Sequence, residues 1–255
     1  MAQVAMGNSR KDWFNRVALK FEMVSPEPFS QYMEKCLAPL LRSGDITPPQ
    51  KDVYRALDLV PFDKVRIVIL GQDPAYQVEG KVHYATGLAF ALNPKIVSKV
   101  ALSKIKGGKS LREIFRAVRL ELKADVCDRP DTSLESWAEQ GVLLLNTALT
   151  TQITIAGAHR KEWRLFVAAL ILALNTHKRS LTFVLTCNAA KDFLPLISSR
   201  HKVFFNYKHP SRCWRVYKNA NCTGTPIRFF QMAKNKGINW KSVFLHTKQP
   251  ALLCA

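Results

Sequence analysis

The chain is poor in acidic residues: 19 Asp and Glu stand against 38 Lys and Arg among 255 residues, which leaves a formal charge of +19. So large an excess of positive charge is the electrostatic footprint of a protein that binds a polyanion, most often nucleic acid. The alternative is a merely soluble basic protein. We therefore expect DNA or RNA as the partner.

The chain also lacks paired cysteines at metal-binding spacing. None of its six cysteines forms a C-x-x-C pair, which argues against a zinc site or an iron–sulfur cluster. A disulfide framework is not expected at this length and cysteine density, so we expect free thiols and no metal. The cysteines are Cys36, Cys127, Cys187, Cys213, Cys222 and Cys254.

Nor do we expect a targeting or membrane segment. Arg10, Lys11 and Asp12 stand near the first residue without an apolar stretch, so we expect no signal peptide. The longest apolar run, Phe166–Leu174, is too short to cross a bilayer. A generic nucleotide-binding protein is disfavoured because the Gly107–Gly108 pair has no phosphate-loop context.

What the sequence does contain is a set of short apolar runs that alternate with helix-like stretches. Four runs, rich in Val, Leu, Ile or Phe and flanked by polar residues, predict buried strands. They are Val65–Leu70, Val142–Asn146, Leu181–Thr186 and Lys202–Tyr207. The alternation predicts an α/β fold with a central four-stranded, mainly parallel sheet and helices on both faces. We expect one domain over residues 1–255, with flexible termini at 1–11 and 242–255.

Three segments have the character of helices between these strands. Ser110–Lys123 carries apolar residues at helical spacing, and its Ser110 and Glu113 resemble a capping box. Glu162–Asn175 is mostly apolar, and Ala189–Ser198 is shorter. The lysine-rich stretch Lys95–Ser110 interrupts the alternation of strands and helices, and we expect a mobile basic loop there.

Polar residues follow the ends of the predicted strands. Asp73 comes after the first, the second ends on Asn146, Asn188 follows the third, and the fourth leads to His209. Because the carboxyl ends of parallel strands meet at one edge of a sheet, we expect the site there.

Each of these residues has a structural and a functional interpretation. Asp73 is a turn residue that bonds its own backbone, or a carboxylate that orients water or stabilises a cation. Asn146 is a satisfied buried amide, or a group that reads an imide edge such as that of uracil. His209 is structural, or a donor to a carbonyl oxygen that gains charge. Together with the aromatic Phe90 on a very basic domain, they favour cleavage of a base from nucleic acid.

Seven segments resemble the family 1 uracil-DNA glycosylases over about residues 12–240, nearly the whole chain. The segment 65–74 looks like that family's water-activating motif, and HPS at 209–211 resembles its catalytic-histidine loop. The remaining similar segments are 46–57, 87–90, 136–150, 158–166 and 238–240.

The resemblance implies a role for each matching residue. Asp73 would activate the water or stabilise the sugar, and His209 would stabilise charge on a uracil oxygen as a neutral imidazole. Asn146 would bond the uracil edge, Phe90 would stack on the ring, and Gln72 would act through its backbone. The family uses no cofactor and no metal, and it flips the base from duplex DNA or takes it from single strands.

Several departures from the family pattern bear on specificity and DNA grip. The tyrosine expected after the first motif is Ala75, followed by Tyr76, and about four extra residues separate Asp73 from Phe90. Tyr76 or Tyr84 could replace the missing pocket wall. The expected tryptophan-glycine pair is Thr186-Cys187, and the intercalating wedge is Trp214, Cys213 or Arg215. These departures favour a divergent member, viral ones included. The expected DNA contacts are Ser110, Asn188, Ser211, Arg212, Trp214 and Arg215.

Two function classes remain at this point. The first is an active monofunctional glycosylase of base-excision repair, and the second is a DNA-binding or polymerase-accessory protein on the same fold with weak or relaxed catalysis. We expect uracil-containing DNA as substrate, a monomer, a proteinaceous inhibitor or a replication protein as partner, and a nuclear location (the host nucleus if viral).

Overall fold

The computed structural model describes residues 7–97, 105, 108–122, 130–205 and 237–244. Its centre is a four-stranded sheet in the order β5-β2-β7-β8 in which all neighbouring strands run parallel. The predicted α/β class, the four strands and their direction are thus confirmed. The strands are β2 (Ile67–Gly71), β5 (Val142–Asn146), β7 (Thr182–Leu185) and β8 (Lys202–Phe205).

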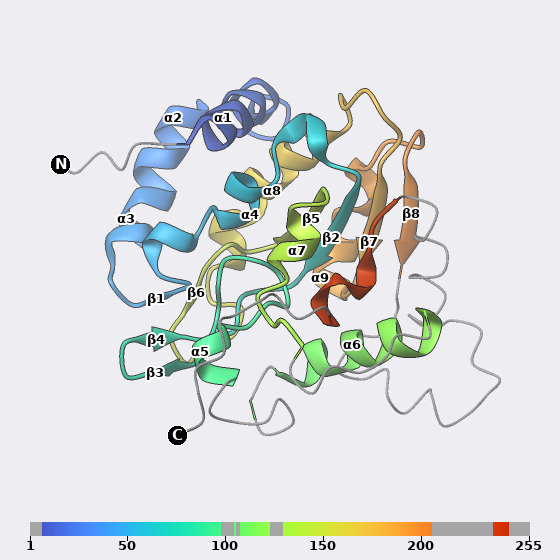
Figure 1. Ribbon diagram of the computed structural model, residues 1–255. Coiled ribbons are helices and arrows are strands. Elements are labelled where there is room, and N and C mark those ends of the chain that lie inside the picture. Colours follow the sequence, from blue (N-terminus) through green and yellow to red (C-terminus); the bar gives the residue numbers. More distant parts are fainter. Residues whose placement is uncertain (1–6, 98–104, 106–107, 123–129, 206–236, 245–255) are drawn as a thin grey trace.

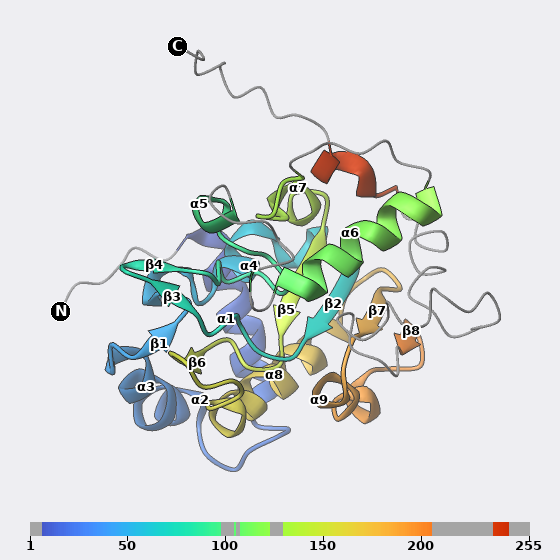
Figure 2. The same ribbon diagram turned by 90° about the horizontal axis from the view of Figure 1, so that it is seen from below.

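Helices lie on both faces of this sheet (Figures 1 and 2). On one face lie α1 (Asn8–Phe21), α8 (Arg160–Leu174) and α9 (Asn188–Lys191). The other face carries α6 (Gly108–Leu122), α7 (Glu135–Ala138) and the 3-10 helix η7 (Trp240–Phe244). The other helices of the described residues are α2 (Phe29–Tyr32), π-helix η1 (Met33–Leu37), α3 (Ala38–Arg42), η2 (Gln50–Asp52), α4 (Arg55–Leu59), η3 (Phe62–Lys64), α5 (Pro94–Val97) and η4 (Leu194–Leu196).

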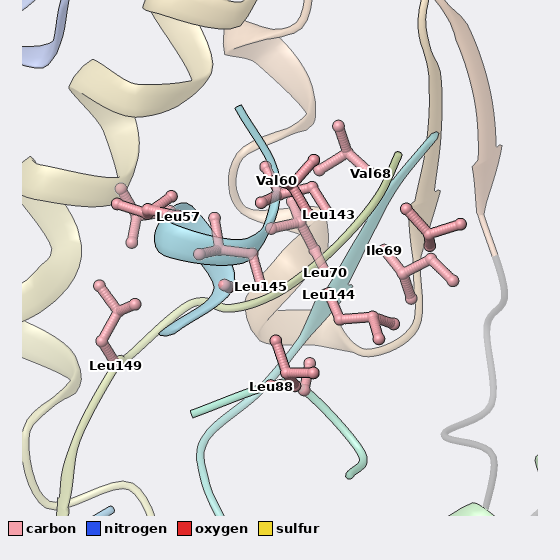
Figure 3. Packing of buried hydrophobic residues seen from close by; sticks show 14 of the residues in the cluster. Leu57, Val60, Val68, Ile69, Leu70, Leu88, Leu143, Leu144, Leu145 and Leu149 are labelled. Atoms are coloured by element: carbon pink, nitrogen blue, oxygen red, sulfur yellow. The ribbon is translucent and has the colours of Figure 1, made fainter. Parts of the chain in front are cut away.

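The sheet is the middle of the hydrophobic core because both of its faces are covered. Every residue of β2, β5 and β7 is buried, which is why these strands are continuous apolar runs rather than alternating ones. Figure 3 shows Val68 and Leu70 of β2 packed beside Leu143 and Leu145 of β5. This packing fixes the carboxyl ends of β2 and β5 next to each other.

Two short antiparallel pairs flank the sheet. Strand β1 (Ile46–Thr47) pairs with β6 (Thr151–Gln152). Strands β3 (Val78–Glu79) and β4 (Val82–His83) form a hairpin, and below its base the Tyr84 amide donates to the Gln77 carbonyl (3.0 Å). This hairpin lies between the exit of β2 and Phe90, in the part of the chain where about four extra residues were noted.

Some expectations about local structure were wrong. Helix α6 begins at Gly108, so Ser110 lies inside its first turn and is no N-cap, and the capping box with Glu113 does not exist. The basic segment expected to be one mobile loop is helical at both ends, in α5 and α6, and its centre lies outside the described residues except for buried Ile105.

Regular structure also reaches into both ends expected to be flexible. Helix α1 starts at Asn8 and η7 continues to Phe244, so residues 8–11 and 242–244 are helical. Trp240 in η7 is buried, and its carbonyl accepts a hydrogen bond from the Trp137 indole (3.1 Å). The C-terminal side of the described chain is therefore tied to α7.

Candidate active site

A cavity of about 220 Å³ lies at the carboxyl ends of β2 and β5. Pockets for drug-sized ligands begin at about 300 Å³, so this volume suits one small planar group such as a single nucleobase. Seven of the residues predicted from the sequence line it: Gln72, Asp73, Ala75, Tyr76, Phe90, Ser110 and Asn146. The structure thus gathers in one place side chains from the β2 exit, the end of β5, the 87–90 turn and α6.

The exits of β2 and β5 are joined by backbone hydrogen bonds. The Gly71 carbonyl accepts from the Thr147 amide (3.0 Å), and the Gln72 carbonyl accepts from the Ala148 amide (3.1 Å) and the Thr147 hydroxyl (2.7 Å). Because the backbone carbonyl of Gln72 already accepts these bonds, the backbone of Gln72 would contact a ligand through its N–H group. The two strand exits form one rigid floor for the cavity.

Asp73 presents a shielded carboxylate to this cavity. Its side chain is 7% exposed, and Arg160 lies with one guanidinium nitrogen 3.4 Å from Oδ1. Within the described residues the carboxylate accepts no hydrogen bond from its own turn. The interpretation of Asp73 as a self-bonded turn residue is therefore not supported, and the carboxylate faces the cavity.

Asn146 is the last residue of β5 and is 6% exposed. It stands in register with Gly71, where an added Cβ would lie 2.4 Å from the Asn146 Oδ1 atom. Among the residues that the structure describes, none forms a hydrogen bond with the Asn146 amide. Because buried amides are normally hydrogen-bonded, this one is available to a ligand in the cavity.

Phe90, like Asn146, lies next to the position that a Cβ on Gly71 would occupy. Its backbone has φ +68, a value uncommon for a residue other than glycine and typical of strained functional positions. The ring edge comes within 3.5 Å of where a Gly71 Cβ would stand, and the preceding amide, of Ala89, donates to Leu144 in β5 (3.0 Å). The ring and the Asn146 amide therefore share the space left open above Gly71.

The wall next to Asp73 is formed by Ala75 and Tyr76. Both line the cavity, whereas Tyr84 is partly buried against the hydrophobic core beside the β3–β4 hairpin. The Ala75 carbonyl accepts from the Thr47 hydroxyl (3.3 Å), and the Tyr76 carbonyl accepts from the Thr154 amide (3.0 Å). Of the two tyrosines proposed to replace the missing wall, Tyr76 is the one at the cavity.

The departure at Thr186-Cys187 has a clear local structure. The Thr186 hydroxyl donates to the Leu70 carbonyl (2.6 Å), and the Cys187 sulfur caps α9 by accepting from the Ala190 amide (3.4 Å). Burial raises the pKa of the Cys187 thiol, so it remains protonated. Asn188, a predicted DNA contact, is exposed as the first residue of α9.

Five predicted residues lie outside the described residues. They are His209, Ser211, Arg212, Trp214 and Arg215, and the third wedge candidate, Cys213, lies outside them too. Within the described ranges, no group of three or more His, Cys, Asp or Glu side chains could hold a metal ion. In the same ranges no helix is long and apolar enough to cross a membrane.

The residue that the sequence analysis missed is Arg160. It is 87 positions from Asp73, on the first turn of α8, and nothing in the spacing of the two residues indicates a contact. The available signal was the segment 158–166, which resembles part of the family pattern and contains Arg160 without a role for it. Ala156, which lines the cavity from the loop before α8, was also missed, and none of the segments that resemble the family contains it.

Comparison with known proteins gives matches over most of the chain. Residues 57–230 match the family model described as the uracil DNA glycosylase superfamily. A protein of Streptomyces coelicolor, uracil-DNA glycosylase 2, is 39% identical over 171 residues, which cover 66% of this chain and 68% of that protein. The uracil-DNA glycosylase of Enterococcus faecalis is 34% identical over 202 residues, or 78% and 80% of the two chains.

Solved structures give a consistent result. The crystal structure of mimivirus uracil-DNA glycosylase is similar with a TM-score of 0.65 and 26% identity, over 80% of this chain and 69% of that one. A variant of the mimivirus enzyme in complex with UGI matches with the same TM-score and 25% identity, over 81% and 71%.

Proposed function

Because the chain belongs to the uracil DNA glycosylase superfamily, we propose that its cavity holds a uracil flipped out of DNA, with Asn146 at the base and Asp73 at the sugar. The enzyme hydrolyses the N-glycosidic bond between uracil and deoxyribose. The roles proposed for Asn146, Phe90 and Asp73 rest on the geometry of the cavity, and the role proposed for His209 rests on its sequence position.

The Asn146 amide, which has no hydrogen-bond partner among the described residues, is the observation that carries the proposal. One acceptor and two donors, 6% exposed at a cavity and without a partner in the described part of the chain, match the alternating donors and acceptors of an imide. A cytosine edge presents an amino group where uracil presents a carbonyl, so the same amide would discriminate between the two bases. Phe90 adds a ring beside the amide on which the base can stack.

Asp73 is suited to stabilising the sugar as the base departs. Departure of the base leaves positive charge on the sugar, as in glycoside hydrolysis, and negative charge on the uracil oxygens. A carboxylate fixed in a shielded turn stabilises the cationic sugar and orients the water that attacks it. The Asp73 side chain is 7% exposed, and low exposure strengthens such electrostatic contributions.

His209 completes the proposed reaction. As a neutral imidazole it would donate a hydrogen bond to the uracil oxygen that gains charge on bond cleavage. Lys208, Arg212 and Arg215 stand near it in sequence and disfavour a second positive charge on the ring.

The alternative of a DNA-binding or polymerase-accessory protein predicts no need for this set of groups. A protein that only binds DNA has no use for a shielded carboxylate and a buried amide at one cavity. The discriminating assay incubates the protein, in EDTA, with a labelled oligonucleotide that contains one uracil, and it detects abasic sites by alkaline cleavage on a gel. Cleavage at the uracil position and not in a thymine control supports the proposed function; absence of cleavage contradicts it.

We also propose that the protein acts as a monomer in the nucleus, which is the host nucleus if the protein is viral. A proteinaceous inhibitor is a further proposed partner, because the similar mimivirus variant was solved in complex with UGI. One experiment tests the monomer and the inhibitor together: the protein is mixed with UGI, and both uracil release and the mass of the species in solution are measured.

A further inference from the structure

Arg160 approaches the carboxylate of Asp73 from the edge of the cavity. Its guanidinium nitrogen lies 3.4 Å from Asp73 Oδ1, and its side chain is 45% exposed whereas that of Asp73 is 7% exposed. Arg160 therefore contacts a shielded carboxylate with one end of its guanidinium and is itself accessible to DNA from the solvent. No role for Arg160 has been assigned so far.

The loop before α8 is shaped to hold Arg160 in this place. Gly157 has φ +70, and an added Cβ would lie 2.6 Å from Arg160 Nε and 2.7 Å from its Cζ. The guanidinium thus rests against a backbone that has no side chain there. The preceding residue, Ala156, lines the cavity, which places the loop at the cavity rim.

The contact between Arg160 and Asp73 leaves most of the guanidinium unused. A guanidinium carries five N–H donors. In the described part of the chain, Arg160 makes one hydrogen bond, long at 3.4 Å, and its other donors have no protein partner. A single long ion pair with a half-exposed partner contributes little to stability, so an anion that enters the site can replace it.

The chemistry proposed for Asp73 gives a reason for such a replacement. A guanidinium held against this carboxylate opposes its interaction with a cationic sugar, because both positive charges compete for the same oxygen atoms. The nucleotide that brings the sugar also brings a phosphate on each side of it. Arginine binds phosphate with two parallel hydrogen bonds, and this is the partner it favours in nucleic-acid recognition.

We propose that Arg160 moves from Asp73 to a backbone phosphate next to the flipped nucleotide when DNA binds. In the free protein Arg160 balances the negative charge of Asp73, which otherwise repels the incoming phosphates. In the complex the phosphate takes Arg160, and the Asp73 carboxylate faces the sugar alone. This inference rests on the role proposed for Asp73, and it makes Arg160 a DNA-binding residue rather than a catalytic one.

The test compares Arg160→Gln with Lys178→Gln, which removes the same charge at the opposite end of the sheet, ahead of β7. Both sites are exposed, so we expect glutamine to be tolerated at each, and thermal unfolding checks this. The probe is a labelled single-stranded oligonucleotide with one tetrahydrofuran abasic analogue, which has both phosphates and cannot be cleaved. Its dissociation constant is measured in EDTA at five KCl concentrations, and kcat and KM for uracil release are measured on the matching uracil oligonucleotide.

For Arg160→Gln we expect about ten-fold weaker binding and a log–log salt slope smaller by roughly 0.7, the value for one phosphate contact on a single strand. We also expect kcat within three-fold of the wild type. Arg160→Lys keeps the slope because it keeps the charge, and Lys178→Gln leaves binding and slope unchanged. An unchanged slope for Arg160→Gln overturns the proposal, and a fall in kcat with that unchanged slope assigns Arg160 to positioning Asp73. Failure of the proposed function is distinguishable, because the wild type then releases no uracil whatever the slopes show.

Discussion

The Asn146 amide occupies the space that a side chain on Gly71 would need: a Cβ there would lie 2.4 Å from Asn146 Oδ1. The two residues end neighbouring parallel strands and stand in register. The missing side chain at the end of one strand thus makes room for the Asn146 amide at the end of the other.

Replacing Gly71 by Ala should therefore displace the Asn146 amide. We expect kcat/KM for uracil release to fall by about 10- to 100-fold, the effect of losing the hydrogen bonds to the base, with DNA binding retained. Gly7→Ala is the matched control, since a Cβ at Gly7 meets nothing within 4 Å. Steady-state kinetics on a uracil oligonucleotide measure both variants, and equal activities for the two would contradict the close approach.

Asp73→Asn keeps the shape of the side chain and removes its charge. We expect kcat to fall by roughly 10²-fold or more, because a neutral amide stabilises the cationic sugar poorly. Affinity for an abasic-analogue oligonucleotide should persist. Asp192→Asn changes the same charge at an exposed position and should be silent. Near-normal turnover of Asp73→Asn would remove Asp73 from the mechanism.

Asn146→Asp replaces the N–H donors of the Asn146 amide with a second carboxylate oxygen. A carboxylate accepts from the amino group of cytosine and repels the carbonyl oxygen of uracil. We therefore expect uracil release to fall and a low rate of cytosine release to appear. Paired oligonucleotides with uracil or cytosine at one position measure the two rates. A variant that treats both bases as the wild type does would show that the amide is structural.

Ala75 has a smaller side chain than the tyrosine that the family resemblance implies at this position of the cavity wall. Tyr76 lines the cavity next to it. We expect measurable release of 5-substituted uracils, with uracil preferred by about 1–3 kcal/mol for one methyl group. Ala75→Tyr should sharpen this preference. The ratio of kcat/KM values for uracil and 5-methyluracil in single strands measures it. If the wild type and Ala75→Tyr have equal ratios, Tyr76 supplies the wall, and Tyr76→Ala should then widen the substrate range.

His201 makes the stability of the fold depend on pH. It is buried, its Nδ1 accepts a hydrogen bond from the Leu181 amide (3.1 Å), and burial lowers its pKa from the usual 6.5. The unfolded chain therefore takes up this proton first. The stabilisation is complete above pH 6.5 and is lost as the pH falls toward the lower folded-state value. We expect urea denaturation between pH 7.5 and 5 to show a smaller loss of unfolding free energy in His201→Asn than in the wild type. Parallel profiles would exclude His201 as the cause.

The sheet and the location of the site could be predicted because both follow from local patterns. Strands buried on both faces are continuous apolar runs, and parallel strands bring their carboxyl ends to one edge. Helix α1 was overlooked, although the buried residues Trp13, Val17 and Phe21 recur every four positions. That spacing is a signal of a helix, and it was available in the sequence.

Other features depend on tertiary contacts and have no local signal. The pairing of Arg160 with Asp73 joins positions 87 apart and depends on how the loop before α8 folds. The positive φ of Phe90 belongs to a turn held by neighbouring strands. The start of α6 at Gly108 rather than after Ser110 shows that a capping-box pattern is overruled when the helix extends beyond it.

The β3–β4 hairpin has a consequence for how this part of the chain can change in length. Its base is closed by the bond from the Tyr84 amide to the Gln77 carbonyl, so residues between these two positions can be inserted or deleted without moving either anchor. Insertions next to Asp73, by contrast, would break the bonds that join Gln72 to Ala148. Length variation among related enzymes should therefore accumulate at the hairpin tip, where a peptide or reporter graft would leave the cavity intact.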